Sequence, residues 1–192
     1  MPISTRAVRI DHEIVIAETV QWLERAVIGL NLCPFAKAVH VKKQIRTVVS
    51  AATNTDALIE SLIDELNFLA ATNANEIDTT LLIHPDTLND FLDYNDFLRI
   101  ADQVLEELRL VGQIQIASLH PQYQFADTKF DDITNYTNRS PYPMLHLLRE
   151  TSIEKAVAAF PDAAIIFEKN MATMEKLGKE GWEKLRSEEY KH

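Results

Sequence analysis

The sequence is poor in several residue types, and each shortage excludes a class of protein. A single cysteine among 192 residues excludes an internal disulfide, so we expect a reducing compartment and a cytoplasmic protein. Four glycines and seven prolines exclude a collagen-like or other low-complexity chain. No apolar run is long enough to cross a bilayer, and none follows the first residues as a signal peptide would require. We therefore predict no membrane partner.

Acidic residues are missing from one part of the chain, between Glu24 and Asp56, although the net charge is −10. They are concentrated in residues 54–110, which hold 13 acids and two arginines and which we interpret as a solvated helical surface. This acidic block disfavours nucleic-acid binding, because such binding requires the neutralisation of many phosphates. The acid-free segment carries five bases that either face a small anion or are exposed to solvent: Arg25, Lys37, Lys42, Lys43 and Arg46.

Hydrophobic periodicity predicts alternating helices and strands. Apolar residues recur every three or four positions from Asp11 to about Leu30, and again in residues 53–72 and 89–111, as in amphipathic helices. The residue pattern predicts strands at 39–50, most clearly at 45–49, and at 79–83 and 113–119, and the continuous apolar run at 79–83 indicates burial on both faces. We predict a single α/β domain over residues 1–192, with a mainly parallel sheet of three or four strands flanked by helices. A helical C-terminal region, with a last helix beginning near Pro161, would end in a solvated tail from about residue 183.

Two predicted strands end in the same dipeptide, His84-Pro85 and His120-Pro121. In open parallel sheets, ligands bind beyond the carboxyl ends of the strands. We therefore expect both histidines at one edge of the sheet, within reach of a ligand. Residues 122–138 follow with little periodicity, which is typical of functional or mobile segments.

The stretch from residue 138 to residue 150 holds the highest density of functional groups. Pro141 and Pro143 stiffen its first half, and Pro143 suits the first position of a helix that would run to about residue 159. Side chains three and four positions apart share one face of a helix. The spacing therefore predicts a base, a cation and a carboxylate on one helix face: His146, Arg149 and Glu150.

This arrangement suggests an anion clamp. Arg139 and Arg149 would hold a carboxylate or phosphate, since a guanidinium binds either group in bidentate fashion. His146 would transfer a proton to the bound molecule, and His120 would approach from the sheet edge. The alternative is structural: each arginine pairs with a neighbouring acid, and each histidine is a satisfied hydrogen-bonding group.

Cys33 is the candidate nucleophile. Pro34 suits the first turn of a short helix, which would place Cys33 at its N-cap. A helix N-terminus and the nearby ammonium of Lys37 both favour the thiolate. We predict that Cys33 faces the same pocket as His120; the alternative is that the cysteine is a small buried apolar residue.

Three functions fit these residues. The first is an enzyme acting on a small anionic metabolite at the carboxyl edge of the sheet, with His120, His146 and Cys33 as catalytic residues. Its ligand-binding residues would be Arg139, Arg149, Tyr123, Asn138, Tyr142, Lys37 and His84. The second is a metal-dependent enzyme, since two histidines and a carboxylate suit iron or zinc, with His120, His146 and Glu150 as ligands. The third is a non-catalytic module that holds a small ligand in the same pocket. The sequence specifies neither a cofactor nor an oligomeric state.

Three motifs carry a resemblance to a known family: Asn31-Leu32-Cys33-Pro34-Phe35, His120-Pro121-Gln122-Tyr123-Gln124-Phe125, and Asn138-Arg139-Ser140-Pro141-Tyr142-Pro143 with His146-Leu147-Leu148-Arg149-Glu150. Together they resemble domain-of-unknown-function family 1415, short proteins of bacteria and plastid-bearing eukaryotes. The resemblance covers nearly the whole chain. It implies no activity, substrate or catalytic residue, because none is established for that family.

Overall fold

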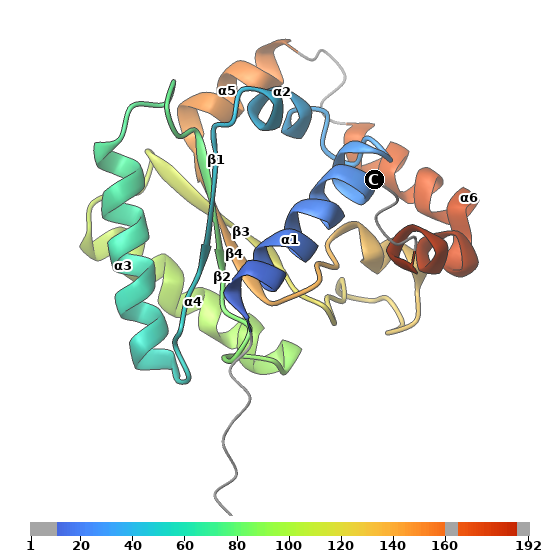
Figure 1. The fold of residues 1–192 in the computed structure, drawn as a ribbon, viewed down its shortest axis with the longest axis horizontal. Helices are drawn as coiled ribbons and strands as arrows, with labels where there is room; N and C mark the ends of the chain where they lie inside the picture. The colour runs from blue at the N-terminus through green and yellow to red at the C-terminus, as the bar shows by residue number, and fades with distance from the viewer. Residues whose placement is uncertain (1–10, 160–164, 188–192) are drawn as a thin grey trace, which may run out of the picture.

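A four-stranded sheet lies at the centre of the protein (Figure 1). The structure is a computed structural model that describes residues 11–159 and 165–187. The strands are β1 (Ile45–Val49), β2 (Thr79–Ile83), β3 (Ile114–Leu119) and β4 (Met144–Arg149), in the spatial order β1-β2-β4-β3. The predicted α/β fold, with one sheet flanked by helices and a helical C-terminal region, is confirmed.

The sheet is only partly parallel, which corrects the prediction of a mainly parallel one. β1 and β2 pair in parallel, whereas β4 lies between β2 and β3 and is antiparallel to both. The three predicted strands still run in the same direction, because β2 and β3 are each antiparallel to the same neighbour. The carboxyl ends of β2 and β3 therefore lie at one edge, and the prediction that His84 and His120 share this edge is confirmed.

The prediction of a helix beginning at Pro143 is wrong, because residues 144–149 form β4 and helix α5 (Glu150–Ala159) begins only afterwards. The short apolar run fits either period, and pairing with two neighbouring strands satisfies its backbone. Side chains alternate along a strand. Leu145 and Leu147 therefore face one side of the sheet, and His146 faces the other, away from Arg149.

One face of the sheet packs against helices α3 (Thr55–Ala71) and α4 (Phe91–Glu107), on the left in Figure 1. Asn54 and Asp90 cap these helices by accepting hydrogen bonds from backbone N–H groups of the first turn. The predicted leucine stripe of α3 is buried. It forms a continuous core with β2, β4 and α4 that includes Leu58, Leu62, Leu66, Leu69, Leu82, Tyr94, Phe97, Leu145 and Leu147.

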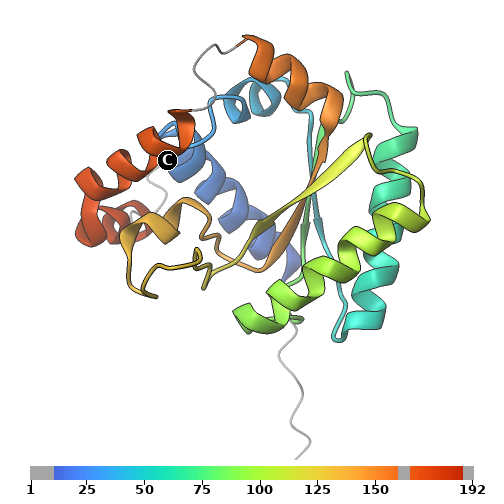
Figure 2. The same ribbon diagram turned by 180° about the vertical axis from the view of Figure 1, so that it is seen from behind.

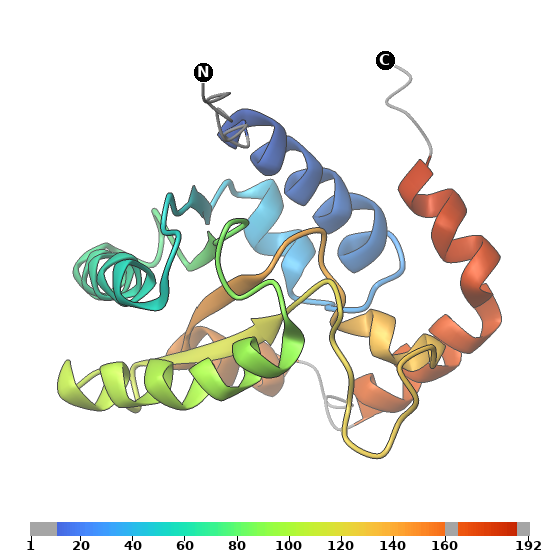
Figure 3. The same ribbon diagram turned by 90° about the horizontal axis from the view of Figure 1, so that it is seen from below.

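The opposite face is covered by α1 (His12–Trp22), its π-helical continuation η1 (Leu23–Ile28), α2 (Ala36–Val41) and α5. Residues 39–41, predicted to begin the first strand, instead end α2, and β1 begins only at Ile45. Figure 3 shows α1 and α4 on opposite sides of the sheet. Helix α6 (Ile166–Ser187) lies beside the short 3-10 helix η2 (Ile133–Thr137), as Figure 2 shows from behind. The predicted start of the last helix near Pro161 lies outside the described residues. Residues 183–187 continue α6, and the rest of the predicted tail is also outside them.

Within residues 11–159 and 165–187, no helix combines the length and the apolar character needed to cross a membrane.

Candidate functional site

A cavity of about 630 Å³ lies between the sheet and the helices α2 and α5, and we call it the sheet cavity. Its walls are mainly aliphatic and aromatic: Trp22, Leu23, Val27, Leu32, Phe35, Val39, Ile45, Leu81, Leu119, Leu148, Ile153 and Ala156. Polar residues also line it, among them Cys33, Asp78, Thr79, Asn138 and His146; Arg149 borders it as well, but its guanidinium is turned toward helix α3. The volume and the few convergent polar groups are typical of small-molecule sites.

The position of His146 in the centre of β4 points its ring at this cavity. The Nε2 atom lies 2.8 Å from the Thr79 hydroxyl, and that hydroxyl donates its only hydrogen to the Leu147 carbonyl at 2.6 Å. The hydroxyl therefore has only a lone pair to offer, so Nε2 carries the proton and donates to it. The Nδ1 atom of the neutral ring is then unprotonated, and it has no hydrogen-bond partner among the described residues.

Burial controls the charge of His146. Loss of hydration lowers its pKa from 6.5 to about 4, so the ring is neutral near pH 7. Because Nδ1 is not among the buried unpartnered atoms, it remains accessible from the sheet cavity. The cavity therefore presents a fixed hydrogen-bond acceptor to its contents.

Cys33 is half-buried and lines the sheet cavity together with His146, not with His120 as predicted. It is not an N-cap either: α2 begins at Ala36, and Cys33 precedes it in a turn in which the Cys33 carbonyl accepts from the Ala36 N–H. Lys37 is exposed and does not line the cavity. The two features expected to favour the thiolate are thus not placed as the sequence suggested.

His120 and His84 lie on the other side of the sheet edge, where both rings contact the buried Tyr94 at 4.9 and 5.8 Å between centroids. His120 donates through Nε2 to the Leu88 carbonyl and accepts through Nδ1 from the Gln122 N–H. His84 donates through Nδ1 to the Thr87 carbonyl. Both rings are buried, and burial lowers both pKa values. This geometry leaves neither nitrogen of His120 open for proton transfer.

Arg149 holds the end of a helix. Its guanidinium donates to the carbonyls of Leu69 and Thr72, both at 2.6 Å, and also to that of Ile77. Leu69 and Thr72 belong to the last turn and C-cap of α3, where carbonyls lack the regular helical donor four residues on; within the helix, the Leu69 carbonyl accepts only a long bond of 3.3 Å from the Thr72 N–H. The cation also complements the negative end of the helix dipole.

Arg139 lies beyond the other end of β4 and is 7% exposed. It donates to the carbonyls of Tyr123 and Phe130, and its guanidinium stacks between the rings of Phe130 and Tyr136 at 4.6 and 4.3 Å. The predicted clamp of Arg139 and Arg149 is therefore not formed, because β4 separates them.

The other predicted ligand-binding residues do not lie together in one pocket. Asn138 lines the sheet cavity. The Tyr123 ring packs against Phe91 and Phe125. Tyr142 donates its hydroxyl to Glu18, and burial together with this hydrogen bond raises its pKa to about 12.

The alternative metal site is not assembled. His120 and His146 lie on different sides of the sheet, and Glu150 begins α5 at the far end of β4. No group of three metal-binding side chains occurs within the described residues.

Sequence reasoning missed Thr79 and Trp22. Thr79 fixes the tautomer of His146 only because β2 and β4 pair, with Thr79 opposite Leu148. Trp22 precedes the π-helical segment, and such segments are frequent at functional sites. No local pattern in the sequence indicates that Thr79 contacts His146 or that Trp22 lines the sheet cavity.

The model of the family described as "Protein of unknown function (DUF1415)" matches residues 14–184. The match spans the strands, the sheet cavity and most of α6. No curated protein and no solved structure matches the chain.

Proposed function

The chain belongs to the DUF1415 family, and we propose that it binds a small, mainly apolar molecule in the sheet cavity and uses His146 as the hydrogen-bond and proton acceptor toward one polar group of that molecule. The observation that carries the proposal is the fixed tautomer of His146. Thr79 occupies Nε2, so Nδ1 is the basic atom, and it is accessible from the cavity.

The walls of the cavity define the class of ligand. An apolar body would be desolvated against the leucine, isoleucine and phenylalanine side chains, and a hydroxyl or amine would donate to Nδ1. The cavity does not select a net charge, because its two nearest charged groups have opposite sign and both are engaged. Asp78 accepts from the Ser152 hydroxyl, and Arg149 donates to helix α3. This supports a neutral or weakly charged ligand over the small anion expected from the sequence.

An enzymatic role is favoured by the presence of Cys33 in the same cavity. Imidazole is the commonest acid–base side chain in enzymes, and a thiol is a strong nucleophile near neutral pH. A non-catalytic binding module would need the apolar walls and the acceptor, but not the thiol. Both functions use the same cavity. An enzyme would convert the bound molecule to a product, whereas a binding module would release it unchanged.

The test is a fragment screen by ligand-observed NMR, carried out on the wild type and on two matched variants of α5. Ala156→Trp places a large side chain in the cavity, whereas Val157→Trp places it on an exposed position of the same helix. Fragments that bind the wild type should be lost from Ala156→Trp and retained by Val157→Trp. His146→Phe should lose those fragments that carry a hydrogen-bond donor. Equal binding to all four proteins would overturn the proposal.

Turnover is tested with the fragments that bind. Incubation with wild type and with Cys33→Ser, followed by mass spectrometry, should give a product or thiol adduct only with the wild type if the protein is an enzyme that uses Cys33. An unchanged ligand with both proteins supports the binding module.

A further inference from the structure

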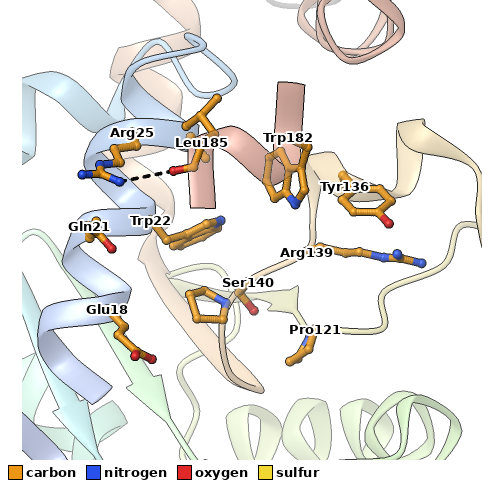
Figure 4. A pocket seen from close by; sticks show the side chains of 12 residues that line it. Glu18, Gln21, Trp22, Arg25, Pro121, Tyr136, Arg139, Ser140, Trp182 and Leu185 are labelled. Atoms are coloured by element: carbon orange, nitrogen blue, oxygen red, sulfur yellow. Dashed lines mark hydrogen bonds between the residues drawn. The ribbon is translucent and has the colours of Figure 1, made fainter. Parts of the chain in front are cut away.

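A second, smaller cavity of about 290 Å³ lies between α1, η1, α6 and the segment before β4, and we call it the tryptophan cleft (Figure 4). Trp22 and Trp182, the only tryptophans of the chain, both line it. Tyr136 packs edge-on against Trp182, with 5.4 Å between ring centroids. Its volume suits a compact molecule, near the lower end of the range for ligand pockets.

The cleft is rich in hydrogen-bond donors. The indole Nε1 of Trp22 is buried and has no acceptor among the described residues, although an indole N–H can only donate. Figure 4 shows the Nε1 atoms of Trp22 and Trp182 turned toward the space enclosed by the two rings, Arg139 and Ser140. A buried donor without an acceptor is costly, so its presence beside a cavity calls for an acceptor supplied from outside the chain.

The charge of the cleft differs from that of the protein. Arg25 and Arg139 line it, against the single carboxylate of Glu18. Both arginines are held by backbone carbonyls: Arg25 donates to Leu185 (Figure 4), and Arg139 donates to Tyr123 and Phe130. The local balance is +1 in a chain of net charge −10. Glu18 is engaged already, since it accepts the Tyr142 hydroxyl at 2.5 Å. An oxygen-rich anion is therefore attracted to this part of the surface and finds donors there.

We propose that the tryptophan cleft binds a compact oxyanion, a phosphate or a carboxylate, whose oxygens accept from the Trp182 indole N–H and from that of Trp22, and that the Trp22 ring turns on binding to expose its Nε1, which is fully buried in the free protein. The aromatic rings of Trp22 and Trp182 flank the contact, and the buried guanidinium of Arg139 adds positive charge to the surroundings of the cleft. This site is separate from the sheet cavity, although Trp22 lines both. It does not depend on the proposed function.

The experiment follows the two indole N–H signals in ¹H–¹⁵N spectra of the ¹⁵N-labelled full chain. Sodium phosphate and sodium acetate are titrated separately, with sodium chloride at equal ionic strength as the reference. We expect both indole signals to move in a saturable way with phosphate or with acetate, and the more effective anion identifies the class. Saturation by neither anion, or an equal response to chloride, would overturn the inference.

Variants that change the charge of the cleft test whether the bound molecule is an anion. Gln21→Glu adds a carboxylate at the cleft and should weaken the anion by about tenfold, the size expected for a charge a few ångströms away at a partly solvated site. Val41→Glu adds the same charge at an exposed position of α2 and is the matched control. Glu18→Gln should tighten binding, since an amide oxygen still accepts from Tyr142. If Gln21→Glu and Val41→Glu bind alike, or if Glu18→Gln weakens binding, the inference is wrong.

A further variant separates this site from the proposed function. His146→Phe alters only the sheet cavity, so it should leave the anion affinity at the wild-type value. A loss of anion binding in His146→Phe would place the anion in the sheet cavity and contradict the tryptophan cleft.

Discussion

The two faces of the sheet use similar aliphatic side chains but are covered in different ways. Toward α3 and α4, the side chains of β2 and β4 form a closed core in which Leu82, Leu145 and Leu147 are fully buried. Toward α2 and α5, the same strands present Leu81, His146 and Leu148 to a cavity. The alternation of side chains along β4 thus gives one face a closed core and the other a cavity.

The largest difference is expected between two adjacent leucines of β4. Leu147→Ala should lower the free energy of unfolding by about 2–5 kcal/mol, because it opens a hole in a closed core. Leu148→Ala should cost less than about 2 kcal/mol, because Leu148 already borders a cavity and loses fewer contacts. Chemical denaturation of both variants measures the contrast, and equal losses would mean that the two faces are packed alike.

A buried histidine lies on each side of the sheet, His84 near α4 and His146 at the sheet cavity, and both should make stability depend on pH. Burial lowers the pKa values of His84 and His146 to about 4, so below pH 6.5 the unfolded chain binds protons that the folded chain does not. Stability is therefore complete above about pH 6.5 and falls toward pH 4, by about 3 kcal/mol for each histidine.

His146→Phe should reduce this slope between pH 6.5 and pH 5, as measured by urea titrations at several pH values. The contributions of His84 and His120, whose pKa values burial also lowers, should remain. If the slope is unchanged in His146→Phe, the cavity hydrates His146 and the contrast between the two faces is weaker than described.

Substitution of Arg149 tests whether this residue, at the end of β4, stabilises the fold. Arg149→Ala should cost about 1.5–3 kcal/mol, the range for hydrogen bonds to charged groups, because two carbonyls at the end of α3 and the Ile77 carbonyl of the following loop lose this donor. Arg149→Lys should not restore this loss, since one ammonium cannot replace the planar fork. Arg99→Ala, at an exposed position of α4, should stay within about 0.5 kcal/mol and serves as the control. A wild-type melting temperature for Arg149→Ala would reopen a ligand-binding role.

The rate at which Cys33 is alkylated tests whether the sheet cavity is open to small molecules, and we expect this change to be smaller than the stability changes above. The thiol is half-buried and lines the sheet cavity, so a small alkylating reagent should label it in the folded protein. Ala156→Trp should slow the labelling several-fold, and Val157→Trp should not. Equal rates for both variants would show that the reagent reaches Cys33 from outside the cavity.

The sequence predicts those parts of the fold that depend on local patterns. The strands at 45–49 and 79–83, the leucine stripe of α3 and the shared edge of His84 and His120 follow from periodicity and strand direction. β4 does not, because six mainly apolar residues fit a helix or a strand, and only pairing with β2 and β3 decides.

The errors in the predicted anion clamp and helix face follow from that one element. As a helix, residues 143–150 would have gathered His146, Arg149 and Glu150; as a strand, they are spread over two faces and one end. The contacts that fix their roles join distant positions, such as His146 with Thr79 and Arg149 with the end of α3. No spacing along the chain encodes these contacts.

The central claim is that the sheet cavity contains an unprotonated His146 Nδ1. The most direct measurement is a long-range ¹H–¹⁵N spectrum of the assigned His146 ring in the free protein at pH 7. We predict the neutral tautomer with the proton on Nε2, which donates to Thr79, and with Nδ1 unprotonated. A proton on Nδ1, alone or together with one on Nε2, would contradict the account.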